Sequence, residues 1–220
     1  MDAGPITFAS CREIHEADPT KQNGVYDLTP SSGPSYKAYC EMTDFDGGWT
    51  LVLKLDGNKP TFEYDKPIWT DTNAHAANKP DLDQQEAKLA SYWSVPFTKI
   101  LLGMIDGGTK RYKVLTMTGT SLHALISPGN EIKTTEGNGF WKGLLASGSI
   151  QTFCNWEGIN ANQVVRIGLV GDETPGCFSS DSAIGFGIKK GEGPACGNFA
   201  DWLPDNGKKD TKTWGYVLVR

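Results

Sequence analysis

The sequence predicts a single α+β domain that is rich in ordered loops. Its 26 glycines and 12 prolines supply many turns, its seven tryptophans can fill a large core, and only 21% of its residues are charged. This composition does not suit a disordered chain or a coiled coil. The 220 residues would suffice for one large domain or two small ones. Since neither a repeat nor a linker divides them, one domain over 1–220 is expected.

The clearest predicted strand covers residues 49–55, where side chains alternate between two faces. One face carries Trp49 and three leucines, and the other carries threonine, valine and lysine, which is typical of a half-buried strand. The preceding Gly-Gly pair permits positive φ angles and suits a hairpin or a bulge. Further strand-like runs cover residues 98–104, 111–117, 164–170 and 212–219. The last of these is expected to close the central sheet.

Three segments have helical character. Residues 82–93 are the best candidate, because Asp81 or Asp83 can cap a helix that carries apolar residues such as Leu89 and Trp93. Shorter helices are expected at 121–126 and 138–145. Residues 57–80 are rich in Asp, Asn, Pro and Lys, and we expect them to form a long ordered loop.

Charge and hydropathy exclude several classes of function. The net charge is −5 and the isoelectric point is about 5.2, without the basic stripe of a nucleic-acid-binding protein. No run of about 18 apolar residues occurs, so no membrane insertion is expected. Residues 1–5 lack the basic and apolar regions of a signal peptide, and we expect a domain trimmed from a longer protein.

No constellation of residues points to catalysis. The histidines His15, His75 and His123 are far apart in the sequence. A nucleophile pair of Cys154 with His123 can be drawn, but no third group is evident to orient it. The five cysteines contain no Cys-x-x-Cys, which argues against a zinc knuckle or a thioredoxin-like site. We therefore expect no enzyme.

Three ordered motifs near the beginning of the chain carry a family resemblance. They read Ser-Cys-Arg-Glu-Ile at 10–14, Asn-Gly-Val-Tyr at 23–26, and Tyr-Cys-Glu-Met followed by Gly-Gly-Trp-Thr within 39–50. In this order they resemble the opening of a fibrinogen-like domain. The resemblance implies a fibrinogen C-terminal-like fold, with a twisted, mostly antiparallel sheet, short helices, long ordered loops and disulfides. Its expected parts are a disulfide-closed subregion at 10–56, a sheet subregion at 57–170, a ligand subregion at 171–211 and a closing strand at 212–220.

The same resemblance implies the disulfide pairs Cys11–Cys40 and Cys177–Cys196. Each would close a loop of roughly 20–30 residues and stabilise the fold by about 3–4 kcal/mol. Cys154 would be left over, either as a buried free thiol or in an intermolecular bond. Two disulfides would indicate an oxidising compartment, so we expect a secreted protein or an extracellular surface.

The segment from 171 to 206 is the expected functional part, because it is rich in glycine and in oxygen-bearing side chains. Calcium takes six to eight oxygen ligands, although a solvated acidic loop would have the same composition and no EF-hand spacing occurs. The stretches Ala183–Gly187 and Cys196–Trp202 resemble the X-type lectins, or intelectins, in which calcium holds a sugar diol. Carried over by position, the resemblance implies Ca²⁺ ligands at Asp181, Glu192 and Asn198.

Aromatic side chains are the expected walls of the ligand site. Trp202 is the best candidate because it lies in a polar loop, whereas Trp214 and Tyr216 alternate in a predicted strand and would equally suit the core. Phe178 and Phe199 could line an apolar pocket such as the acetyl pocket of fibrinogen-like lectins, or they could belong to the core.

These observations favour a secreted, calcium-dependent lectin domain that binds cell-surface glycans or glycoproteins. The alternative is a protein-interaction or adhesion module of the same fold, in which calcium is purely structural. A single exposed sugar site binds weakly, so useful avidity would require several copies. We therefore expect a multivalent or homo-oligomeric protein.

Overall fold

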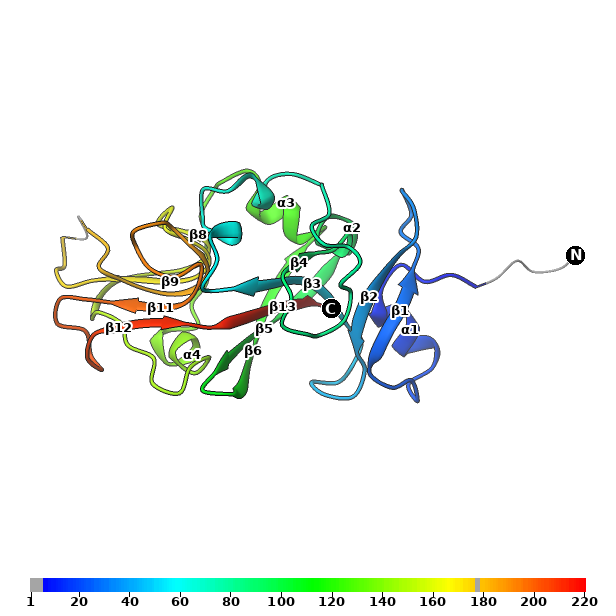
Figure 1. Cartoon of the computed structure of the whole chain (residues 1–220), viewed down its shortest axis with the longest axis horizontal. Helices are drawn as coiled ribbons and strands as arrows, with labels where there is room; N and C mark the ends of the chain where they lie inside the picture. Colours follow the sequence, from blue (N-terminus) through cyan, green and yellow to red (C-terminus); the bar gives the residue numbers. More distant parts are fainter. Residues whose placement is uncertain (1–5, 177–178) are drawn as a thin grey trace, which may run out of the picture.

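Two antiparallel sheets lie one after the other along the long axis of the protein (Figure 1). The computed structural model describes residues 6–176 and 179–220. The seven-stranded sheet has the order β1 (Gly24–Leu28), β2 (Tyr36–Glu41), β3 (Trp49–Asp56), β13 (Trp214–Val219), β5 (Phe97–Asp106) and β6 (Thr109–Gly119), with β4 (Ala87–Lys88) beside β3. The six-stranded sheet has the order β12 (Lys209–Lys212), β11 (Cys196–Ala200), β10 (Ser182–Ile188), β9 (Val165–Asp172), β8 (Phe153–Ala161) and β7 (Ile132–Lys133).

Short helices accompany the sheets: α1 (Cys11–Ala17), α2 (Ser91–Ser94), α3 (Leu122–Ile126), α4 (Asn138–Lys142), and the 3₁₀ turns η1 (Pro60–Phe62) and η2 (Pro67–Trp69). The side chain of Ser121 accepts a hydrogen bond from the backbone N–H of Ala124 and so caps α3. Strands, short helices and loops together confirm the predicted α+β class. The helix expected at 121–126 is present, and the one expected at 138–145 is present but ends at Lys142. None of the helices in the described ranges has the length and apolar character needed to span a membrane.

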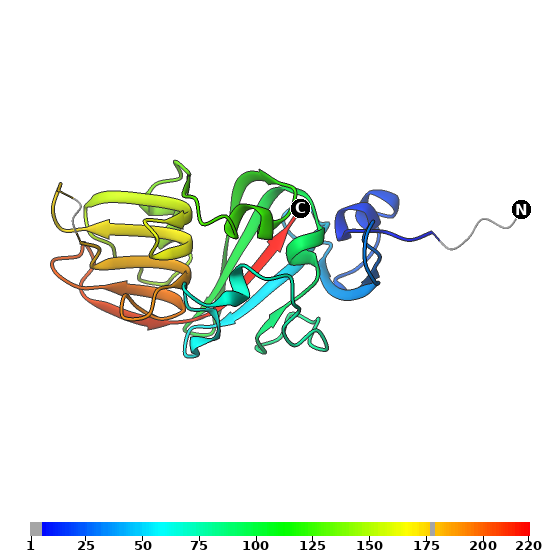
Figure 2. The same ribbon diagram turned by 90° about the horizontal axis from the view of Figure 1, so that it is seen from above.

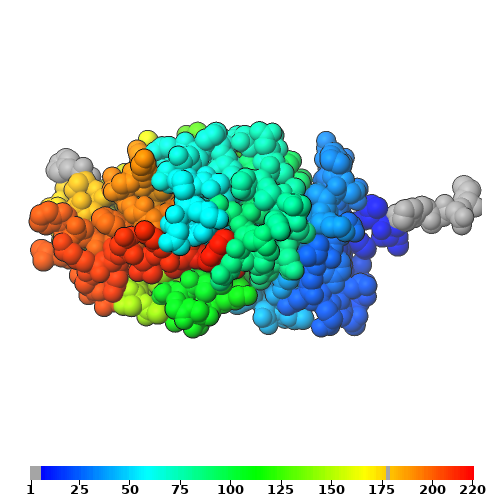
Figure 3. All heavy atoms as spheres, viewed as in Figure 1, coloured from blue at the N-terminus to red at the C-terminus, as the bar shows by residue number. Residues whose placement is uncertain are grey.

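The two ends of the molecule differ. Figure 2 shows the six-stranded sheet at one end and α1 with the β1–β2 hairpin at the other. In the space-filling view of Figure 3, α1 and the β1–β2 hairpin lie far from the loops around β11 and β12. The disulfide Cys11–Cys40 joins α1 to β2, as expected.

Strand β13 connects the two sheets. It follows β12 after the single residue Thr213 and then enters the middle of the seven-stranded sheet, where Val217 is paired with Leu53 of β3 and Leu102 of β5. At the junction, the Thr213 N–H donates to the Cys196 carbonyl oxygen at 3.0 Å. The predicted closing strand therefore lies at the centre of its sheet.

The main core fills the space between the sheets and the short helices. Its largest members include Phe62, Trp69, Tyr92, Trp141 and Phe186. Strand β3 is buried along its whole length rather than on one face. Its leucines belong to two apolar clusters: Leu53 and Leu55 lie in the main core, and Leu51 lies in a second cluster with Leu218 of β13.

The helix predicted at 82–93 is wrong except for its last turn, α2. Ala87 and Lys88 instead pair with Lys54 and Leu53 of β3, which requires extended backbone. Asp81 and Asp83 do not cap a helix, because both bind the buried Lys54: its Nζ donates to the Asp81 carbonyl oxygen at 2.7 Å and pairs with the Asp83 carboxylate.

The other cysteine predictions are corrected by the structure. Cys196 is a free, buried thiol rather than half of a disulfide, and its predicted partner Cys177 lies outside the described residues. The Cys196 side chain lies in the interior against β13, where a Cβ at Gly215 would be 2.5 Å from its sulfur. Burial raises the pKa of the Cys196 thiol to about 12. Cys154, expected to be free or intermolecularly paired, takes part in a disulfide within the chain.

Candidate functional site

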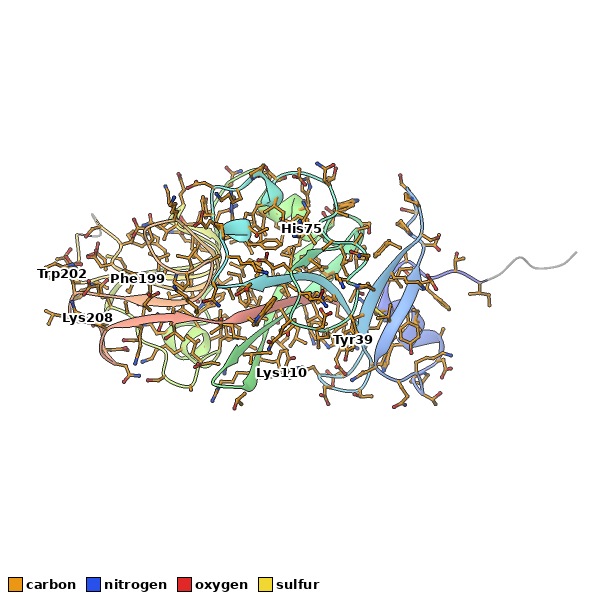
Figure 4. All side chains as sticks on the ribbon, viewed as in Figure 1. Tyr39, His75, Lys110, Phe199, Trp202 and Lys208 are labelled. Atoms are coloured by element: carbon orange, nitrogen blue, oxygen red, sulfur yellow. A yellow bond between two sulfur atoms is a disulfide. The ribbon has the colours of Figure 1, made fainter. Side chains whose placement is uncertain are left out.

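The loop between β11 and β12 presents two large apolar side chains to solvent. Trp202 is 65% exposed and Leu203 is 90% exposed. Figure 4 shows Trp202 at the extreme end of the molecule, with Lys208 beside the same loop. An exposed tryptophan next to an exposed leucine is unusual, because burying two such side chains normally gains several kcal/mol. We call Trp202 and Leu203 the apolar tip.

The backbone of the apolar tip is strained. Trp202 has a φ of 43° and Leu203 a φ of 52°, so both lie in the left-handed region that favours glycine. Each such residue costs on the order of 1–2 kcal/mol. Surrounding interactions must therefore hold this conformation.

Hydrogen bonds from Gln151 and from two aspartates of the loop supply those interactions. The Gln151 side chain is inaccessible to solvent, and its Nε2 donates to the Trp202 carbonyl oxygen at 2.7 Å. The Trp202 N–H donates to the Asp201 carboxylate at 2.9 Å. Further along, the Asp205 N–H donates to the Ile150 carbonyl oxygen at 3.0 Å, and the Ile150 N–H donates back to the Asp205 carboxylate at 3.1 Å. These hydrogen bonds hold the apolar tip in one conformation.

Lys208 and Asp201 lie at the apolar tip, and acidic residues lie near Gln151, whose Nε2 is 3.4 Å from the Glu173 carboxylate. Lys208 pairs with Asp201, and its Nζ lies 5.9 Å from the centre of the Trp202 ring, within range of a cation–π interaction. The pKa of Glu173 is raised, chiefly by its hydrogen bond with Asp181. Burial alone would raise the pKa of Asp172, yet backbone N–H groups of Thr174 and Ser179 hydrogen-bond its carboxylate and lower it.

The residues predicted to bind calcium do not form one ligand set. Asn198 is buried, and its Oδ1 accepts a hydrogen bond from the Ser149 N–H at 2.9 Å. Its Nδ2 donates to the carbonyl oxygens of Ser149, Ala183 and Phe199. Its amide hydrogens are all used, and its oxygen already accepts one hydrogen bond in a buried position, so these contacts support a structural role for Asn198.

The other two predicted ligands are acidic and partly exposed. The pKa of Glu192 is raised, first by burial and then by the negative charge of Asp181. Within the described residues, no three His, Cys, Asp or Glu side chains are grouped closely enough to hold a metal ion. The donor set therefore does not fit an open calcium site built on Asn198, and calcium binding stays a prediction.

The predicted aromatic walls separate into three environments. Tyr216 is buried, and its hydroxyl lies 3.4 Å from the Asp83 carbonyl oxygen, so it belongs to the core. Trp214 is partly buried, with Lys59 Nζ 5.9 Å from its ring. Phe199 is also partly exposed and lines an open cavity of about 400 Å³, together with Lys59, Glu63, Asp210 and Lys212. Phe178 lies outside the described residues.

The structure gives no support to the nucleophile pair. Cys154 is bonded in a disulfide and has no thiol to activate. The ring of His123 lies elsewhere, with Nε2 3.0 Å from the Thr70 carbonyl oxygen and the ring against Tyr92.

The sequence singled out Trp202, whose ligand role stays a prediction, but not Leu203 beside it or Gln151, which holds its backbone. Leu203 follows Trp202 and precedes a proline in a polar loop, and that run was the available signal for an exposed pair. Gln151 gave no signal, because it lies 51 residues away in the sequence and its role depends on tertiary contact.

Comparison with known proteins gives partial matches. No protein-family model matches the chain. Human angiopoietin-2 is 37% identical over 59 residues, which are 26% of this chain and 12% of that protein. The dog protein is 36% identical over 59 residues, and the mouse protein is 38% identical over 58 residues. The matched stretch therefore spans about an eighth of the length of these relatives.

Two solved structures resemble the whole chain more distantly. The fibrinogen-like globe domain of human ANGPTL6 aligns with 98% of this chain and 96% of its own, at 14% identity and a TM-score of 0.39. That of human ANGPTL2 aligns with 96% of this chain and 98% of its own, with the same identity and TM-score. Over about a quarter of its length, the chain is thus similar in sequence to mammalian angiopoietin-2.

Proposed function

We propose that this chain is a fibrinogen-like protein-interaction module of a secreted protein, and that it contacts a protein partner through the apolar tip. The observation that carries the proposal is the exposed pair Trp202–Leu203, held by buried Gln151 in a strained conformation. Tryptophan is among the residues that most often dominate binding energy at protein interfaces. The sequence similarity to angiopoietin-2 supports an interaction role over an enzymatic one.

The shape of the tip favours a protein partner over a sugar. The Leu203 side chain offers no hydrogen bond to a polyol. Leu203 is 90% exposed and Trp202 is 65% exposed, and Figure 4 shows Trp202 at the extreme end of the molecule. A projecting apolar pair gains most when a partner's pocket encloses it. Because the hydrogen bonds to Gln151 and Asp201 fix the loop beforehand, binding loses little conformational entropy.

A lectin remains the second candidate, and the cavity beside Phe199 is the observation that favours it. Its lining combines an aromatic ring with lysine amines and carboxylates, which could hydrogen-bond sugar hydroxyls. In this second proposal calcium would contribute to glycan binding, as the resemblance to intelectins implies.

The test is binding of a fluorescent, artificially multimerised domain to a panel of cultured animal cells. We expect protease treatment of the cells to abolish binding, and glycosidases or EDTA to leave it unchanged. Trp202→Ser and Leu203→Ser should each weaken binding at least tenfold, whereas the control Val25→Thr, an exposed apolar site on β1, should not. Loss of binding in EDTA with resistance to protease would establish the lectin instead, and full binding by Trp202→Ser would refute the role of the tip.

A further inference from the structure

Strand β6 forms an open edge of the seven-stranded sheet. Within residues 6–176 and 179–220, it pairs with β5 alone, and Figure 1 shows it as the outermost strand on that side. Among the described residues, no backbone hydrogen bond from another segment reaches β6. At 11 residues, β6 is more than twice as long as β1, the edge strand on the other side of the sheet, which has five.

The turn before β6 determines which of its backbone groups face outward. Gly107 and Gly108 form a two-residue hairpin loop, and Asp106 is paired with Thr109. In such hairpins the flanking pair is hydrogen-bonded, and bonded and non-bonded pairs then alternate. The register runs without a shift as far as the pair Lys99–Thr116. The N–H and C=O groups that point away from β5 therefore belong to alternate residues, namely Lys110, Tyr112, Val114 and Thr116.

This edge carries cations without counterions. Lys110, Arg111 and Lys113 form no ion pair with a carboxylate in the described residues, although the chain as a whole has a charge of −5. Lys110 Nζ lies 5.9 Å from the Tyr216 ring and Lys113 Nζ lies 5.9 Å from the Phe140 ring. Since Lys110 and Lys113 differ by an odd number of positions, they lie on opposite faces of the sheet. Positive charge thus flanks the open edge on both faces.

We propose that the outer edge of β6 binds an extended acidic peptide segment, which adds to the sheet as an antiparallel strand. The four outward-facing residues would supply its backbone hydrogen bonds. Side chains directly opposite each other in a sheet lie about 5 Å apart, so acidic residues opposite Lys113, Arg111 and Lys110 would meet the three cations. The recognised pattern is acidic-x-acidic-acidic, preceded by residues that favour strands.

A second copy of β6 fits this edge less well. Antiparallel self-pairing centred on Val114 would place Lys113 opposite Leu115 and Arg111 opposite Met117, which leaves the cations uncompensated. Lysines on edge strands also discourage unselective pairing. The same charges that repel other basic edges would attract an acidic segment, which gives the edge selectivity.

The test uses the whole domain and the labelled peptide Thr-Val-Thr-Val-Glu-Thr-Glu-Glu, with binding measured by fluorescence anisotropy. A peptide with lysine in place of each glutamate is the charge control. We expect the acidic peptide to bind, and its affinity to fall with salt. Thr116→Pro should weaken binding at least tenfold, because it removes one outward N–H without touching the β5 ladder. The matched control Thr116→Ala keeps that N–H and should bind normally.

A charge variant keeps the test decisive if the proline variant does not fold. Lys113→Glu should weaken binding of the acidic peptide at least tenfold and strengthen binding of the lysine peptide. Equal binding of the two peptides to the wild type, or no binding of either, would overturn the proposal. Self-association in sedimentation velocity that Thr116→Pro abolishes would assign the edge to a second copy instead.

This proposal is independent of the apolar tip. Figure 4 shows Lys110 well away from Trp202 along the long axis. Trp202→Ser should therefore bind the acidic peptide as the wild type does, so failure of one proposal leaves the other standing.

Discussion

Replacing Asn198 with aspartate tests whether Asn198 is a calcium ligand or a structural residue. Aspartate is the better ligand for calcium, so a ligand role predicts that Asn198→Asp keeps or raises calcium affinity. The structure predicts the opposite outcome. The Asn198 Nδ2 donates to three carbonyl oxygens, at 2.9 Å for Ser149, 3.0 Å for Ala183 and 3.1 Å for Phe199. In the variant a carboxylate oxygen would face three acceptors in a buried site.

The magnitude follows from these contacts. Each hydrogen bond contributes about 1 kcal/mol net, and burial of an unpaired charge adds to the loss, so we expect a destabilisation of about 3–5 kcal/mol. For a domain of this size that corresponds to a fall in Tm of roughly 6–20 °C. Burial would raise the pKa of the new carboxyl group, so the loss should grow as pH rises through that pKa.

The assay is urea unfolding followed by tryptophan fluorescence, run in calcium and in EDTA. Asn130→Asp, at an exposed position, is the control for the charge alone and should change stability little. An Asn198→Asp protein as stable as the wild type, or one that calcium restores, would refute the structural role of Asn198.

Three further outcomes are expected from the fold. Ser121→Ala should lower the unfolding free energy by about 1 kcal/mol in urea, because α3 loses its N-cap. Replacing Cys11 and Cys40 together with serine should cost about 3–4 kcal/mol by the same measurement, since the disulfide closes a separation of 29 residues. Asp172 has a lowered pKa in the folded state, so its contribution is present at neutral pH and lost as pH falls below about 4. Asp172→Asn should therefore lower the Tm at pH 7 and approach the wild type in acid.

Local patterns were enough to predict much of the fold. The alternation of side chains and the Gly-Gly turn predict a strand at 49–55, and the structure has β3 there. The short helix expected at 121–126 is present as α3, which Ser121 caps. Both signals depend on contacts within a few residues, which a sequence displays directly.

Features that depend on distant contacts were missed. Residues 82–93 had good local helix signals, but the buried Lys54 binds the intended caps and β3 pairs with Ala87 and Lys88. Asn198 was assigned as a calcium ligand from the resemblance to intelectins, and a sequence does not display that its Oδ1 accepts a hydrogen bond from the Ser149 N–H, 49 positions away. Cys196 was expected to form a disulfide, but it is a buried free thiol that lies against Gly215 of β13. In each case a contact with a residue that is distant in the sequence determines the role of the side chain.

The position of β13 has a consequence for synthesis of the protein. Its neighbours β3 and β5 leave the ribosome long before it does, because β3 ends at Asp56 and β5 at Asp106, whereas β13 begins at Trp214. Until β13 inserts between them, the nascent chain carries two facing, mostly apolar strand edges with nothing in the gap. Such edges are sites of mispairing, so this domain should depend on chaperones during translation and should complete its central sheet in one late, cooperative step.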